Sequence, residues 1–230
     1  MPTLLLLAHG STKDPAVSEH VQTIAAAVAA LLHEVEVRVA FHKQDPFIRD
    51  ALALCKGPVV VYPLLMARGY FADEVFPREL GARNDVVWLP PLGEDPRLID
   101  VILECLARHT GHVVIAGHGT PRHPASRTTI ERCVAVLRAA RQFDSVASGF
   151  LDDEPALADV IASPRYNHSS VAVVPYFLAD GPHVTVDLPA ELHIPPERDV
   201  DLRVLRALGA DERIPALIVR STRDALSTSD

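Results

Sequence analysis

The chain has 230 residues, of which 48% are hydrophobic and 23% are charged, the composition of a globular protein and not of a disordered or fibrous one. Its formal net charge of -8 is spread without long runs of one sign, which argues against a nucleic-acid or anionic-membrane surface and favours a small-molecule partner. The opening leucines are too few for a signal-peptide core and no apolar stretch is long enough to span a membrane, so we expect a cytoplasmic protein.

Short β-branched or leucine-rich runs alternate along the chain with longer stretches of helical periodicity. The expected strands, in chain order, span residues 3–8, 34–40, 58–63, 85–89, 112–117, 144–149, 170–175 and 200–204. The clearest helices are expected at 15–32 and 124–141, where alanine, leucine and valine recur at helical intervals. This alternation predicts an α/β fold in which parallel sheets are covered by helices on both faces.

The two halves of the chain repeat one another. His9 aligns with His118 at an offset of 109 residues, and AFHKQDPFI (40–48) aligns with GFLDDEPAL (149–157) at the same offset. Further along the chain, small insertions increase the offset between aligned residues of the two halves. We therefore predict two similar domains, 1–110 and 111–230, each with about four parallel strands, and a ligand site in the cleft between them.

In both halves an apolar run ends on a histidine followed by glycine, in LLLLAHG (4–10) and VVIAGHG (113–119). Ligands of open parallel sheets bind beyond the carboxyl ends of the strands, so His9 and His118 are placed where binding occurs. The glycine is expected to leave room for a close ligand. A histidine at such a position is also compatible with a purely structural, hydrogen-bonded role.

The second half supplies partners for its histidine. His183 follows the strand at 170–175 and Asp152 follows the strand at 144–149, so both are expected at the same edge as His118. Two imidazoles and one carboxylate form an open site for a divalent first-row metal ion. Asp187, four residues after His183, is a candidate to orient its ring, with a solvated helix charge as the alternative.

The corresponding positions of the first half carry different chemistry. Lys43 aligns with Asp152 and Phe71 aligns with His183. An ammonium group repels a cation and a phenyl ring cannot ligate one, so only His9 is left of a metal set there. His42 and Tyr70 are expected as pocket wall or surface. No phosphate-binding glycine loop of the GxxxxGK[ST] or GxGxxG kind is present, so no nucleotide cofactor is expected.

Several motifs of the chain resemble one family. They read AGHGTPRHP (116–124), GFLDDEP (149–155) and VVPYFLADGPHVTVDLP (173–189) in the second half, with LLLLAHGSTKDP (4–15) and VYPLLMARGYFADEVFP (61–77) as first-half counterparts. This pattern resembles the class II chelatases of the CbiX/SirB type, the sirohydrochlorin cobalto- and ferrochelatases. The segment from Gly181 to Pro189 is its most specific part.

The resemblance implies insertion of a divalent metal ion, Co²⁺ or Fe²⁺, into a sirohydrochlorin-type tetrapyrrole for cobalamin or siroheme biosynthesis. The metal is then a substrate, the tetrapyrrole is the partner, and no nucleotide takes part. His118 and His183 match the family's paired histidines, and Asp152 stands where the family commonly has glutamate. Candidates for the apolar wall around the tetrapyrrole are Tyr70, Phe71, Tyr176 and Phe177. Candidates for contacts with its carboxylates are Arg68, Arg122 and Arg127.

Two other hypotheses stay open at this point. The altered first half and the aspartate at position 152 are compatible with a homologue that binds or carries metal or tetrapyrrole without catalysis. A protein that uses an unrelated cleft is the third possibility. It would be indicated if His118 and His183 lay more than about 8 Å apart, because ligands that share a first-row metal ion sit about 2 Å from it.

Overall fold

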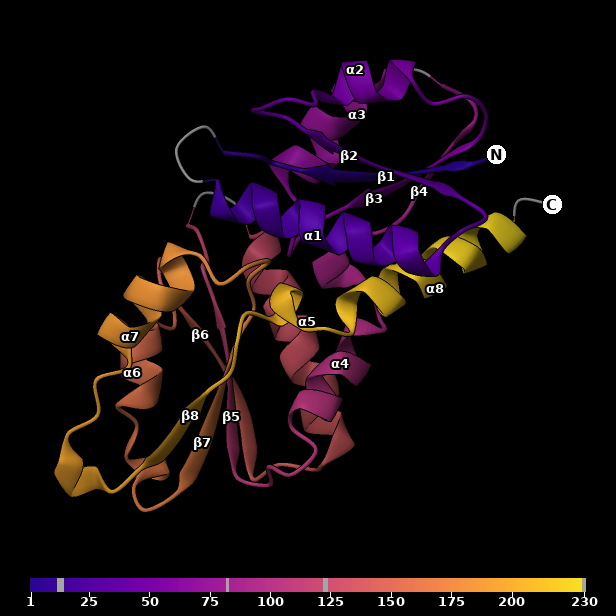
Figure 1. Ribbon diagram of the computed structural model, residues 1–230. Helices are drawn as coiled ribbons and strands as arrows, with labels where there is room; N and C mark the ends of the chain where they lie inside the picture. The colour runs from indigo at the N-terminus through magenta and orange to yellow at the C-terminus, as the bar shows by residue number, and fades with distance from the viewer. Residues whose placement is uncertain (12–14, 82, 122–123, 229–230) are drawn as a thin grey trace. The chain divides into compact units, whose positions relative to one another are not determined.

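The computed structural model describes residues 1–11, 15–81, 83–121 and 124–228 (Figure 1). It divides into two compact units, one formed by Met1–Asp95 with Glu212–Asp230 and the other by Pro96–Asp211. Each unit contains one four-stranded parallel sheet with helices on both faces. The predicted α/β class and the eight predicted strands are confirmed, with strand ends within two residues of the expected positions. Within the described ranges, no helix is long and apolar enough to cross a membrane.

The first unit has the strand order β2-β1-β3-β4. Its strands are β1 (Thr3–Ala8), β2 (Glu36–Phe41), β3 (Val59–Pro63) and β4 (Val86–Trp88). Its helices are α1 (Ala16–Leu31), α2 (Ile48–Ala53), α3 (Phe76–Leu80) and α8 (Ile214–Ser227), with a π-helical turn (Phe71–Val75) before α3 and a 3-10 turn (Leu92–Glu94) after β4. Figure 1 shows α2 and α3 on one side of this sheet and α1 and α8 on the other.

The four leucines of β1 are fully buried, as expected of a central parallel strand that is covered on both faces. Leu5 and Leu7 pack into the same core cluster as Ile48 of α2 and Phe76 of α3. Side chains alternate along a strand, so Leu4 and Leu6 point to the opposite face. The run LLLL is therefore continuous because both faces of β1 need an apolar side chain at every position.

The second unit repeats this topology with the strand order β6-β5-β7-β8. Its strands are β5 (His112–Gly117), β6 (Ser145–Phe150), β7 (Ser170–Pro175) and β8 (Asp201–Val204). Its helices are α4 (Leu98–Cys105), α5 (Ala125–Ala140), α6 (Leu157–Ile161) and α7 (Leu188–Glu191), with a π-helical turn (His183–Asp187) and 3-10 turns at Pro164–Tyr166, Pro196–Arg198 and Leu208–Ala210. In Figure 1, α6 and α7 lie on one side of the sheet and α4 and α5 on the other.

The compact units differ from the sequence halves 1–110 and 111–230 by an exchange of helices. Helix α4 ends the first sequence half but packs against α5 in the second unit. Helix α8 ends the second sequence half but packs against α1 and β3 in the first unit. A helix with an apolar stripe must bury it somewhere, and here each terminal helix buries its stripe in the unit formed by the other half.

A buried carboxylate fixes the exchanged helix α8 in the first unit. Asp95 is 3% exposed, and its Oδ2 accepts hydrogen bonds from the Tyr62 hydroxyl at the end of β3, at 2.9 Å, and from the Ser221 hydroxyl of α8. The repeat places Asp211 at the equivalent point of the second unit, where it accepts a bond from the Cys105 thiol of α4 at 3.3 Å. Both junctions thus join a carboxylate to the helix received from the other half.

We predict that Asp95→Ala lowers the free energy of unfolding by about 2–4 kcal/mol, because two buried hydroxyls lose their shared acceptor. Ser221→Ala is the comparison variant and should cost less, because it removes one donor and leaves Asp95 its bond from Tyr62. Thermal and urea unfolding of both variants measure the difference. Equal losses in the two variants would contradict the special role of Asp95.

Candidate functional site

Three of the predicted site residues lie at the carboxyl edge of the second sheet. His118 directly follows β5, Asp152 lies two residues beyond β6, and His183 begins the π-helical turn after β7. Strand β5 pairs in parallel with β6 on one side and with β7 on the other, so all three strands end at the same edge. The topology therefore gathers residues that are far apart in the sequence.

The rings of His118 and His183 meet edge to face, with centroids 4.6 Å apart and an interplanar angle of 86°. Nδ1 of His118 lies 2.7 Å from the Gly119 carbonyl oxygen, and Nδ1 of His183 lies 2.7 Å from Oδ2 of Asp187. Both oxygens accept the hydrogen bond, so in the neutral imidazole each Nδ1 carries the donated proton and each Nε2 has the lone pair. Asp187 thus contacts the ring of His183, and the two histidine rings lie well within the 8 Å expected of ligands that share a metal ion.

Asp152 is less well placed than the two histidines. Its Oδ2 lies 3.5 Å from Nδ1 of His118, the nitrogen that already donates to Gly119, and its side chain is 65% exposed. Among the residues that the structure describes, no group of three His, Cys, Asp or Glu side chains is arranged to hold a metal ion. Of the predicted set, the structure brings the two imidazoles into contact, and Asp152 approaches Nδ1 of His118.

The aromatic residues proposed as walls differ in accessibility. Phe177 stacks on His183 with centroids 5.9 Å apart and 28° between the planes. Tyr176 is only 5% exposed, so most of this side chain belongs to the interior. In the first unit Tyr70 is 51% exposed, and its ring contacts Phe71 edge to face at 5.5 Å. Phe177 and Tyr70 thus keep more surface for a flat ligand than Tyr176 does.

The arginines proposed to meet substrate carboxylates already hold carboxylates of this chain. Arg127 pairs with Asp153 through Nε and Nη2, and this hydrogen bonding lowers the pKa of Asp153. Arg68 pairs with Glu94 and Asp73. Arg122, the third candidate, lies outside the described residues. A substrate carboxylate would have to compete with these partners for Arg127 or Arg68.

The glycine after His118 has a different role from the expected one. Gly119 adopts a φ of +69°, and a Cβ atom there would lie 2.4 Å from Cβ of Asp153 and 3.0 Å from Cβ of Phe150. The space beside this glycine is therefore filled by the protein and is not left for a ligand. The residue permits the left-handed turn that carries the chain past its own side chains.

The equivalent edge of the first unit is filled by packed rings. His9 contacts Phe71 edge to face with centroids 4.4 Å apart, and the ring of His42 lies 6.0 Å from that of His9. Nδ1 of His42 lies 2.6 Å from Oε1 of Glu79 on α3. Sequence reasoning treated His42 as wall or surface and missed this pair, because no spacing motif joins two residues 37 positions apart.

The environment of His9 disfavours its charged form. Burial lowers the pKa of His9, the hydrogen bond to the Gly10 carbonyl opposes this shift, and the electrostatic influence of Lys43 and His42 lowers the pKa further. The imidazole of His9 is therefore neutral at pH 7.

Both halves of the chain are similar to one known protein family. The family model described as CbiX matches the chain twice, over residues 3–109 and 112–225. A protein of Halobacterium salinarum named "Probable sirohydrochlorin cobaltochelatase" is 29% identical over 83% of this chain and 76% of its own length. The sirohydrochlorin cobaltochelatase of Methanopyrus kandleri is 30% identical over 50% of this chain and 96% of its own length.

Solved structures agree with this result. The structure titled as CbiX, the terminal enzyme for biosynthesis of siroheme in denitrifying bacteria, superposes with a TM-score of 0.78 at 30% identity, covering 97% of this chain and 99% of that one. SirB from Bacillus subtilis with Fe³⁺ has a TM-score of 0.84, covering 99% of this chain and 96% of that one. At 16% identity, the match to SirB shows a similarity of fold alone.

Two tandem α/β halves of the chelatase type define the class of this protein. Both halves match the same family model, and together the matches cover nearly the whole chain. The chain belongs to the CbiX family.

We predict that Gly119→Ala destabilises the second unit by about 2–4 kcal/mol, because it adds both backbone strain and a steric overlap. Gly81→Ala is the comparison variant: Gly81 has nearly the same φ, +68°, with an extended ψ of -169°, and nothing lies within 4 Å of a Cβ there. It should cost about 1–3 kcal/mol from backbone strain, without any steric overlap. Thermal unfolding compares the two, and a smaller loss for Gly119→Ala would refute the steric argument.

We predict that the imidazole of His9 titrates below the ordinary histidine value of 6.5. Between the lowered pKa and 6.5 the unfolded chain binds the proton more readily than the folded chain, so this contribution to stability is lost as the pH falls through that window. An NMR titration of the imidazole resonances measures the midpoint. Lys43→Met should move it upward without reaching 6.5, because burial is the larger cause. A midpoint at or above 6.5 in the unmodified protein contradicts the prediction.

Proposed function

We propose that this protein inserts a divalent metal ion, Co²⁺ or Fe²⁺, into a sirohydrochlorin-type tetrapyrrole, as a step of cobalamin or siroheme biosynthesis in the cytoplasm. His118 and His183 bind the metal as substrate, and Asp152 assists. The observation that carries the proposal is the contact of two imidazole rings at one sheet edge, each with its Nδ1 already committed to an oxygen. The second half, 111–230, holds this site, and the first half, 1–110, is its degenerate copy.

The spacing of the two rings suits one shared ion. A metal–imidazole bond is about 2.0–2.1 Å long, so two rings that bind one ion through Nε2 have centroids roughly 4–6 Å apart. The distance of 4.6 Å falls within that range. A first-row ion with only two firm protein ligands keeps open positions for pyrrole nitrogens and is released easily, which is what a metal donor requires.

Proton movement accompanies the transfer. A tetrapyrrole that takes up a divalent ion releases two pyrrole N–H protons, and imidazole is a suitable acceptor near pH 7. Asp187 accepts a hydrogen bond from Nδ1–H of His183 at 2.7 Å, which fixes the orientation of the ring and leaves Nε2 to face the ion. His118 and His183 can therefore bind the ion first, and each can take up one of the two protons once the ion has left.

The names of similar proteins support the substrate class. The relatives from Halobacterium salinarum and Methanopyrus kandleri are named as sirohydrochlorin cobaltochelatases. The CbiX structure at 30% identity is described as that of the terminal enzyme of siroheme biosynthesis. A SirB structure of the same fold is described as a complex with cobalt. These names favour cobalt and iron without choosing between them.

A second candidate function is binding or delivery of metal or tetrapyrrole without insertion. It is favoured by one observation, the side chain of Phe71 packed against His9 at the place that corresponds to His183. The proposed metal-binding pair then lies in the second unit, and an assay of metal insertion distinguishes an enzyme from a carrier.

We predict that His118→Ala and His183→Ala each lower the rate of Co²⁺ insertion by more than about 100-fold, because losing a ligand costs more than the 10–100-fold typical of a residue that only orients one. The rate is followed by the change in the visible spectrum of sirohydrochlorin. His168→Ala, which changes an exposed histidine at the amino end of β7, is the control and should keep full activity.

Two outcomes would count against this proposal. Unchanged activity in both variants would show that His118 and His183 do not form the metal-binding site. An unmodified protein that binds Co²⁺ but does not insert it would establish the carrier function.

A further inference from the structure

The segment that carries His183 is held by a second segment of the same unit. Oδ1 of Asp180 accepts a hydrogen bond from the Ala207 backbone N–H at 2.6 Å, and Oδ2 accepts one from Nε of Arg206 at 3.0 Å. The Gly209 N–H donates to the Phe177 carbonyl at 2.9 Å. We name the contacts of Asp180 with Arg206 and Ala207 the loop anchor.

Gly209 brings the two segments into close contact. A Cβ atom at this position would lie 2.4 Å from the carbonyl oxygen of Leu178 and 2.7 Å from its Cα. The segment after β7 therefore lies directly on the 3-10 turn Leu208–Ala210. The loop anchor joins this segment, at Asp180, to the two residues before the 3-10 turn, and Asp180 lies three residues before His183.

The two contacts of the loop anchor differ in strength. Ala207 is 1% exposed, so its N–H is buried, and losing its acceptor would leave an unsatisfied donor. The side chain of Arg206 is 76% exposed. An ion pair that is so accessible to water contributes little to stability. The backbone contact of Asp180 is therefore the main one.

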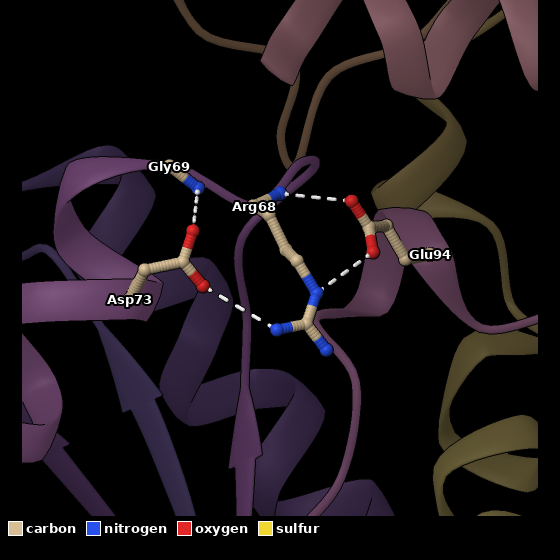
Figure 2. A network of polar contacts seen from close by, with 4 residues as sticks. All are labelled: Arg68, Gly69, Asp73 and Glu94. Atoms are coloured by element: carbon tan, nitrogen blue, oxygen red, sulfur yellow. Dashed lines mark hydrogen bonds and ion pairs between the residues drawn. The ribbon is translucent and has the colours of Figure 1, made fainter.

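The first unit joins the same two segments with the opposite polarity. Figure 2 shows Arg68, from the segment after β3, bound by Glu94 of the 3-10 turn after β4. Glu94 accepts from the Arg68 backbone N–H at 3.2 Å and from its Nε at 3.1 Å. The Gly93 N–H donates to the Leu65 carbonyl at 3.0 Å, as Gly209 does to Phe177. The segment joined in this way carries Phe71 in place of His183.

We infer that Asp180 is a positioning residue for His183. This inference rests on the proposed metal-binding role of that histidine. The chain begins the π-helical turn three residues after Asp180, so a loop free to move at Asp180 transmits its movement to the ring that meets His118. By fixing the loop, Asp180 keeps the ring of His183 beside the ring of His118.

The test measures Co²⁺ binding by calorimetry and by the visible absorption of bound Co²⁺, together with kcat and KM for insertion. We expect Asp180→Ala to raise the Kd for Co²⁺ about 10-fold and to lower kcat with little change in KM for sirohydrochlorin, as for other residues that orient a metal ligand. Arg206→Ala should change the Kd less than about fivefold, because it removes only the exposed ion pair. Asp180→Asn keeps an oxygen for Ala207 and should restore much of the affinity.

Glu94→Ala is the matched control because it removes the equivalent carboxylate from the first unit. It should leave Co²⁺ binding unchanged. If Asp180→Ala and Glu94→Ala have the same effect on Co²⁺ affinity and on kcat, the loop anchor only stabilises the fold and the inference is overturned.

Failure of the proposed function gives a different result. In that case His183→Ala binds Co²⁺ as tightly as the unmodified protein. This result would reject both the metal-binding role of His183 and the effect of Asp180 on metal binding. The imidazole resonances of His183 then still report position: we expect Asp180→Ala to shift or broaden them and Glu94→Ala to leave them unchanged. Unchanged resonances in Asp180→Ala would show that Asp180 does not position His183.

Discussion

Parallel pairing of β5 between β6 and β7 is the constraint on which the candidate site depends. It brings the carboxyl ends of three strands to one edge, and with them residues that follow those strands 30 to 65 positions apart in the chain, such as His118, Asp152 and His183. No local structure could bring these side chains together. The helices, turns and buried runs of the second unit hold this edge in place, and the two rings meet there at 4.6 Å.

The same framework carries different chemistry in the first unit. Its sheet has the same strand order and its histidine follows the same central strand, but that ring packs edge to face against Phe71, which stands at the place of His183. Burial lowers the pKa of His9 and leaves it a neutral member of an aromatic cluster. A duplicated fold thus preserves the position of a side chain more readily than its function, because the position is set by the strand and the function by its neighbours.

The exchange of α4 and α8 makes each compact unit depend on both halves of the sequence. Each exchanged helix donates a hydrogen bond to a carboxylate that ends the segment after the fourth strand, through Ser221 to Asp95 and through Cys105 to Asp211. A repeat that is continuous in the sequence is therefore not the unit that folds around one core.

The sequence by itself determined the strands, the repeat and the gathering of His118 with His183, because apolar runs and strand ends are local patterns and parallel topology fixes which ends meet. It also indicated Asp187, which lies within one turn of the ring that it holds. Only the tertiary structure decided which unit receives each terminal helix, that Asp152 approaches Nδ1 of His118, and that Asp180 joins a segment 27 residues further on. These features depend on side-chain contacts between distant parts of the chain, and no periodicity or spacing in the sequence encodes such contacts.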